Sequence, residues 1–155
     1  MVTIEEKKQL IAKARKLGHD YLLKYEHCAP ATLQAVSDTL DMKISDDTFK
    51  SSIGLSGYSG GCGGTCGGIA SAGIYFGKNK EEFSVNPDSS KIRKASDYIK
   101  DKFVETYGGF LCDEIRMKLW GRLENIPSSE YMAECPLVCE NAAGWAVEAI
   151  LANKS

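Results

Sequence analysis

The most constraining feature of this sequence is a glycine-rich segment from Gly54 to Gly77, which holds ten of the fifteen glycines in the chain. Glycine adopts backbone conformations that other residues avoid, so this density indicates a loop over the first half of the segment. The second half, from Thr65 to Phe76, is compatible with a helix for which Thr65 would be the N-cap. Because each helical glycine costs about 1 kcal/mol relative to alanine, such a helix needs close packing by its neighbours.

The rest of the chain has the apolar spacing of amphipathic helices, and no segment has the pattern of a strand. We therefore predict an all-α fold, a single-domain helical bundle over residues 1–155 that carries the glycine-rich, cysteine-bearing loop. A short turn is expected from Ser128 or Ser129 to Met132, separate from the last helix. The other expected helices run from Thr3 to about Tyr25, Pro30 to about Leu40, Ser45 to Ile53, Ser89 or Ser90 to Tyr107, Leu111 to Trp120, and Pro136 to about Asn153.

Charge and hydropathy exclude several classes of protein. The net charge is -2, whereas a protein that binds nucleic acid through phosphate contacts needs a basic surface. No apolar run reaches the roughly 18 to 20 residues of a membrane span. The charged N-terminal segment lacks the apolar stretch of a secretory signal, so we expect a cytoplasmic protein. In that reducing compartment, cysteines serve more often as metal ligands or redox groups than as structural disulfides.

Four of the six cysteines are expected at or near helix starts, where Cys28, Cys66, Cys112 and Cys135 fall. A helix N-terminus presents unpaired N–H groups and the positive end of the helix dipole. Both stabilise a thiolate, which is the form that binds metals and attacks disulfides. We therefore expect these four cysteines to form the core of a shared site.

The remaining cysteines complete two pairs with four-residue spacing, Cys62 with Cys66 and Cys135 with Cys139. That spacing places two side chains on one face of a helix. Cys62 and Cys139 are expected to act as extra ligands or as resolving thiols. Glycines permit close approach of the backbone to a bound group, and we expect this role for Gly60, Gly61, Gly63 and Gly64.

The cysteine pattern resembles that of a family of redox-active bacterial proteins named for the motif C_GCAxxG_C_C. The segment Cys28-Ala29-Pro30-Ala31 is similar to the first site of the family, and Cys66-Gly67-Gly68-Ile69-Ala70-Ser71 to the central motif. Gly68 stands where the motif has alanine, and Ser71 where it has glycine. The third and fourth sites are similar to Gly108-Gly109-Phe110-Leu111-Cys112 and Cys135-Pro136-Leu137-Val138. The resemblance implies a redox role, and a related module at the C-terminal end of split-Soret cytochromes implies an iron–sulfur cluster.

Three hypotheses follow for the function. The first is an electron carrier with an iron–sulfur cluster bound by thiolates from the six cysteines at positions 28, 62, 66, 112, 135 and 139. The second is a metal-free protein that cycles between dithiol and disulfide. The third is a helical interaction module, with or without zinc. The sequence does not indicate which protein is the redox partner. It leaves open whether the chain is an oxidoreductase or an electron-transfer component, and whether it forms a homodimer.

Overall fold

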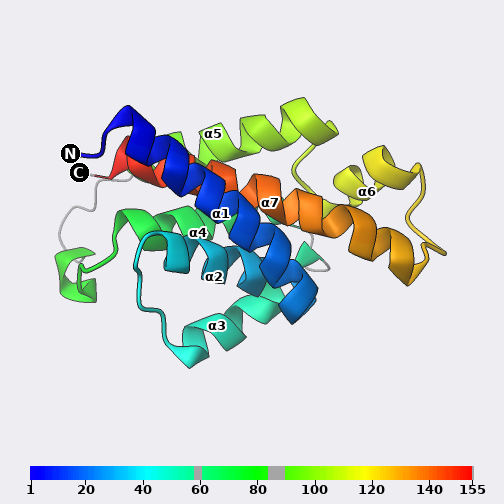
Figure 1. Ribbon diagram of the computed structural model, residues 1–155, viewed down its shortest axis with the longest axis horizontal. Coiled ribbons are helices and arrows are strands. Elements are labelled where there is room, and N and C mark those ends of the chain that lie inside the picture. The colour runs from blue at the N-terminus through cyan, green and yellow to red at the C-terminus, as the bar shows by residue number, and fades with distance from the viewer. Residues whose placement is uncertain (58–60, 84–89, 155) are drawn as a thin grey trace.

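The computed structural model describes residues 1–57, 61–83 and 90–154, and all of the regular secondary structure over these residues is helical. The predicted all-α fold is therefore confirmed (Figure 1). Two short 3₁₀ helices, η1 (Ile53–Leu55) and η3 (Lys80–Phe83), lie between longer elements. The α-helices are α1 (Ile4–Tyr25), α2 (Cys28–Thr39), α3 (Asp46–Ser52), α4 (Cys62–Ile74), α5 (Ser90–Tyr107), α6 (Cys112–Trp120) and α7 (Ser128–Asn153).

Most helix boundaries follow from local capping chemistry. Thr3 and Glu6 form a capping box at the start of α1, in which each side chain accepts the other residue's backbone N–H. The Ser45 hydroxyl accepts the Thr48 N–H at 3.1 Å and so begins α3. Gly121 ends α6 with a φ of 68°, a conformation that glycine adopts without the steric penalty of a Cβ. The first, third and sixth helices thus begin or end close to the positions predicted from the sequence.

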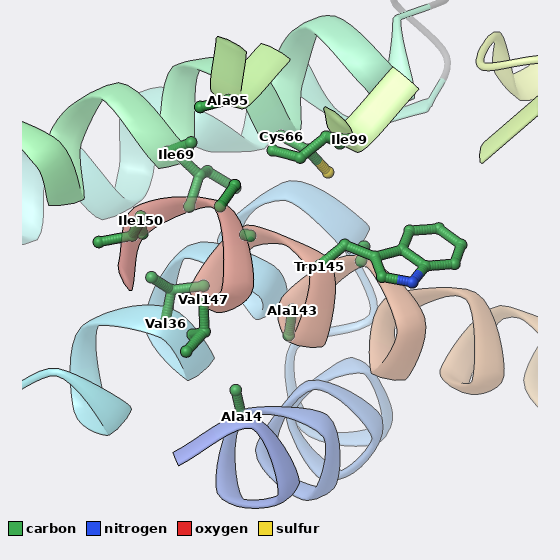
Figure 2. Close-up of a cluster of buried hydrophobic side chains, with 14 of the residues drawn as sticks. Ala14, Val36, Cys66, Ile69, Ala95, Ile99, Ala143, Trp145, Val147 and Ile150 are labelled. Atoms are coloured by element: carbon green, nitrogen blue, oxygen red, sulfur yellow. The ribbon is translucent and has the colours of Figure 1, made fainter. Parts of the chain in front are cut away.

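Helix α7 is the centre of the fold, because it packs against α1, α2, α4 and α5 (Figure 1). Most of its buried side chains meet those of the surrounding helices in the main hydrophobic core, of which Figure 2 shows a part. The contact with α1 is very close: a Cβ on Gly18 would lie 2.5 Å from the Cys139 carbonyl oxygen and 2.9 Å from the Ala143 Cβ. Small residues therefore bring the backbone of α7, and with it Cys139, close to the first helix.

The start of α4 was wrongly predicted. The helix begins at Cys62, one turn before the expected cap, and the Thr65 hydroxyl instead donates to the Leu55 carbonyl oxygen at 2.6 Å. The extra turn is held from outside the helix, since the Gly63 N–H donates to the Phe110 carbonyl oxygen at 3.0 Å. A glycine-rich sequence gives no local sign of a helix whose first turn depends on such a tertiary contact.

The start of α7 was also wrongly predicted, because the helix begins at Ser128 and continues through Pro136. Proline lacks the N–H that would bond to the Met132 carbonyl, which normally disfavours it inside a helix by about 3 kcal/mol. Here Pro136 is fully buried, and its packing offsets this cost. Cys135 consequently lies within a long helix rather than at a helix start.

The two chain ends lie close together at one end of the molecule, whereas α6 lies at the other (Figure 1). The connection between α1 and α2 is short, so Cys28 follows the far end of α1 directly. None of the helices in the described residues combines the length and the apolar character that crossing a lipid bilayer requires.

Candidate functional site

All six cysteines gather around Cys28, although up to 111 residues separate them in the sequence. Each of the other five lies close enough to Cys28 for their charges to influence one another. The Cys28 carbonyl oxygen also accepts hydrogen bonds from the Thr32 hydroxyl at 2.8 Å and from the Cys139 thiol at 3.9 Å. Residues from α2, α4, α6 and α7 thus contribute sulfur atoms to one region of the protein.

Three of these cysteines are the first residues of their helices: Cys28 of α2, Cys62 of α4 and Cys112 of α6. The predicted location at a helix start is confirmed for Cys28 and Cys112. It is wrong for Cys66, which lies one turn inside α4, and for Cys135, which lies inside α7. Cys62 has the place at the start of α4 that the sequence assigned to Cys66.

Cys62 and Cys112 are in direct contact. The Cys62 thiol donates a hydrogen bond to the Cys112 sulfur, and this bond lowers the pKa of Cys112 to about 7. Burial opposes the shift, and the positive charge of Arg116 adds to it. The same hydrogen bond, followed by burial, raises the pKa of Cys62. At neutral pH a large fraction of Cys112 is therefore thiolate while Cys62 stays protonated, which is an arrangement for nucleophilic attack by Cys112.

Gly57 is next to both Cys28 and Cys112. Its N–H donates to the Cys28 sulfur at 3.2 Å, and a Cβ at this position would stand 2.6 Å from the Cys112 sulfur. Burial raises the pKa of Cys28, while the Gly57 N–H and the Ser56 hydroxyl partly offset that effect. Gly57 thus supports one sulfur with its N–H and makes room for another by lacking a side chain.

Two cavities meet at Cys28. The outer cavity has a volume of about 520 Å³ and is lined by Cys28, Cys112 and Cys135, with Gly57, His27 and Arg116 among its other residues. The inner cavity has a volume of only about 30 Å³ and is lined by four cysteines, at positions 28, 62, 66 and 139. Cys28 is the cysteine common to both linings. The Cys62–Cys112 contact joins the two groups of sulfur atoms at a second point.

The thiols of the inner cavity are held in the neutral form. Cys66 is 4% exposed and Cys139 is 1% exposed. Burial raises the pKa of Cys66 to about 12 and that of Cys139 well above its usual value. Figure 2 shows Cys66 next to Ile99 among the hydrophobic side chains of the core. These two thiols are therefore weak nucleophiles at neutral pH, in contrast to Cys112.

Arg116 is one helical turn after Cys112 on α6, and both residues line the outer cavity. The guanidinium donates hydrogen bonds to the Tyr131 hydroxyl at 2.6 Å and to the Leu123 carbonyl oxygen, and it lies 3.5 Å from the Asp113 carboxylate. These contacts fix the position of the positive charge that stabilises the Cys112 thiolate.

The glycines expected to contact a cofactor have different environments. A Cβ on Gly63 would stand 2.9 Å from the Phe110 Cβ, so this glycine is required for packing. Gly61 is the N-cap of α4, and a Cβ on Gly61 or Gly64 would meet no atom within 4 Å. Gly60 lies outside the described residues, as does Ser89. The contact of Gly63 gives this glycine a structural role, whatever the site binds.

Three residues near the sulfur atoms were missed in the sequence: Ser56, Gly57 and Arg116. Arg116 could have been found, because its four-residue spacing from Cys112 places both on one face of the expected helix. Ser56 and Gly57 carry no such signal, since their position beside Cys28 and Cys112 depends on tertiary contacts.

The difference in acidity between the thiols predicts selective alkylation. In the reduced protein, the reaction of Cys112 with iodoacetamide should have its midpoint near pH 7, so that its rate rises about tenfold from pH 6 to pH 8. Cys66 and Cys139 should stay unmodified at pH 7 because they are buried and neutral. Peptide mass spectrometry after timed alkylation measures each site separately.

A pair of variants at Cys62 tests the cause of this acidity. Cys62→Ala removes the hydrogen-bond donor, so the Cys112 midpoint should move upward, whereas Cys62→Ser retains a donor and should move it less. A midpoint for Cys112 near pH 8.5 in the wild type, or equal midpoints in the two variants, would contradict the assignment.

The fold and the site together define a class of protein: an all-helical protein in which cysteines from several helices lie close together. The family model described as "Putative redox-active protein (C_GCAxxG_C_C)" matches residues 26–149, and the chain belongs to this family. The match covers most of the chain and includes all six cysteines. No curated protein and no solved structure matches the chain.

Proposed function

We propose that this protein is a thiol–disulfide redox protein in which Cys112 is the attacking thiolate and Cys62 is the resolving thiol. The observation that supports this assignment is the contact between the two sulfur atoms, in which the Cys62 thiol donates to Cys112. The residues are the first of α6 and α4, and helix N-termini stabilise thiolates. Cys112 also lines the outer cavity, through which a partner can reach it.

The reaction is an exchange with a disulfide of a partner molecule. The Cys112 thiolate attacks one partner sulfur, a mixed disulfide forms, the partner's S–S bond breaks, and the other partner sulfur leaves as a thiolate that takes a proton. Cys62 then loses its proton and attacks the Cys112 sulfur. This forms the Cys62–Cys112 disulfide and releases the second partner thiol. Two electrons pass from the protein to the partner, and the reverse sequence reduces the protein again.

Mass spectrometry after equilibration in glutathione redox buffers tests this proposal. We expect a reversible loss of two hydrogens located at Cys62 and Cys112, which disappears in Cys62→Ser and persists in Cys66→Ser. The second variant is the matched control, because Cys66 lies on the same helix but is buried away from Cys112. Free thiols at both positions under oxidising conditions, or a disulfide at another pair only, would contradict the proposal.

An iron–sulfur cluster is a second candidate, and the convergence of six thiols from four helices favours it. Thiolate sulfur is the usual ligand of such clusters, so the donor type fits. When bound, a cluster would supply one-electron transfer. We assign its ligation to the three helix-start cysteines, Cys28, Cys62 and Cys112, and to Cys135. Of these, Cys28, Cys112 and Cys135 line the outer cavity, and Cys62 contacts Cys112. Within the part of the chain that the structure describes, no three Cys, His, Asp or Glu side chains already surround a common point, so these sulfurs would have to move closer.

Metal analysis separates the two candidates. After anaerobic reconstitution with iron and sulfide, a cluster protein should contain both elements in stoichiometric amounts and absorb visible light, and Cys112→Ser should lose that absorbance. A colourless, iron-free protein would exclude the cluster and leave dithiol chemistry. The same measurement of metal content tests for zinc.

A further inference from the structure

The sulfur atoms of the site are not equally able to reach one another. Cys62 contacts Cys112 directly, and Cys62 lines the small inner cavity together with Cys28. Gly57 is next to both Cys28 and Cys112, with its N–H on one sulfur and its Cα side against the other. Cys62 therefore contacts Cys112 and also shares the small inner cavity with Cys28.

From this geometry we propose that Cys28 removes the disulfide from Cys112 by exchange at Cys62, so that the protein stores two disulfides rather than one. This relay deepens the proposed function and rests on it. The relay starts from the Cys62–Cys112 disulfide that the reaction with a partner leaves. Its product is a Cys28–Cys62 disulfide within the inner cavity.

The exchange step is balanced within the chain. The Cys28 thiol loses its proton and attacks the Cys62 sulfur of the Cys62–Cys112 disulfide. The Cys28–Cys62 bond forms, the Cys62–Cys112 bond breaks, and Cys112 leaves as a thiolate. No electron enters or leaves, because one disulfide replaces another. The attacked Cys62 sulfur is next to both other sulfurs, because it lines the inner cavity with Cys28 and contacts Cys112.

The released Cys112 thiolate can react with a second partner disulfide. Cys62 is then occupied, and the other thiol that lines the outer cavity with Cys112 is Cys135. The charges of Cys112 and Cys135 influence each other, which places the two residues near one another. Cys135 therefore resolves the second mixed disulfide and forms Cys112–Cys135. The protein then contains two disulfides, one in each cavity, and has given up four electrons in total.

Stepwise oxidation of the reduced full-length protein tests the relay. The probe is 4,4′-dithiodipyridine, added at one and then two equivalents, with an acid quench, alkylation and disulfide mapping at increasing times. One equivalent should give Cys62–Cys112 first and Cys28–Cys62 afterwards. Two equivalents should give Cys28–Cys62 together with Cys112–Cys135.

Cys28→Ser is the diagnostic variant, because a serine hydroxyl can still accept the Gly57 N–H but cannot form a disulfide. It should form Cys62–Cys112 and stop there, so that its uptake of oxidant is half that of the wild type. Cys135→Ser should form Cys28–Cys62 but no second disulfide. Unchanged far-ultraviolet circular dichroism verifies that both variants retain their helices.

The outcomes distinguish the relay from the function on which it rests. If Cys62–Cys112 forms in the wild type but Cys28–Cys62 never follows, the relay is wrong and the thiol–disulfide function stands. If Cys28→Ser takes up as much oxidant as the wild type, the relay is also wrong. If Cys62–Cys112 does not form at all, both proposals fail.

Discussion

Replacing Gly57 with alanine should slow the formation of the Cys62–Cys112 disulfide by about tenfold or more. The added Cβ would lie 2.6 Å from the Cys112 sulfur, closer than two such atoms can approach, so this sulfur must move away. Displacements of about 1 Å at a reacting atom commonly reduce a rate by one or two orders of magnitude. Gly57 does not have a positive φ, so an alanine there carries no backbone strain that could explain the effect instead.

Gly54→Ala is the matched control for this experiment. Gly54 lies three residues earlier, and a Cβ at that position would meet no atom within 4 Å. We expect Gly54→Ala to form the disulfide at the wild-type rate and to leave the Cys112 alkylation midpoint unchanged. Alkylation of samples quenched at increasing times measures the rate of disulfide formation, and alkylation at several pH values measures the Cys112 midpoint. Equal rates for the two alanine variants would show that Gly57 does not position Cys112.

Gly18→Ala should lower the free energy of unfolding by about 2–3 kcal/mol, the upper part of the range for overpacked cores. Its Cβ would lie 2.5 Å from the Cys139 carbonyl oxygen and 2.9 Å from Ala143, both on α7. A carbonyl oxygen belongs to the backbone, so it cannot rotate away as a long side chain could. The two helices would have to separate, which would weaken the main packing contact of the fold.

Urea unfolding followed by circular dichroism measures this change, and Gly68→Ala provides the control. Gly68 is an exposed position within α4 where a Cβ meets nothing within 4 Å. Alanine should therefore stabilise the protein there by about 0.5–1 kcal/mol through its higher helix propensity. If Gly18→Ala were as stable as Gly68→Ala, the close approach of α1 and α7 would not be as described.

The sequence predicts those parts of the fold that local chemistry determines. Thr3, Ser45 and Gly121 are capping residues with clear signals, and the helices that they begin or end were predicted close to their observed positions. The helix starts at Cys28 and Cys112 were also predicted within two residues, although neither helix has a side-chain N-cap hydrogen bond. Of the three cysteines that occupy helix starts, the sequence therefore predicts two, Cys28 and Cys112.

The errors occur where tertiary contacts override local preference. The glycines before Thr65 predict a loop, but the Phe110 carbonyl holds them in the first turn of α4. For this reason the sequence placed Cys66, and not Cys62, at the start of that helix. Pro136 commonly marks a first helical turn, yet here burial keeps it within α7. Gly57 could not be recognised, because its importance depends on a sulfur atom 55 residues away in the chain.

The position of the chain ends has a practical consequence. Helix α1 has 22 residues, so about 33 Å of helix separates the N-terminal end of the molecule from the residues next to Cys28. A similar length of α7, about 27 Å, separates Cys135 from the end of the last helix. An affinity tag, a fluorescent reporter or a surface tether attached at either terminus would therefore stand well clear of the opening near Cys112. Immobilised protein could be cycled electrochemically with its reactive face directed toward solution.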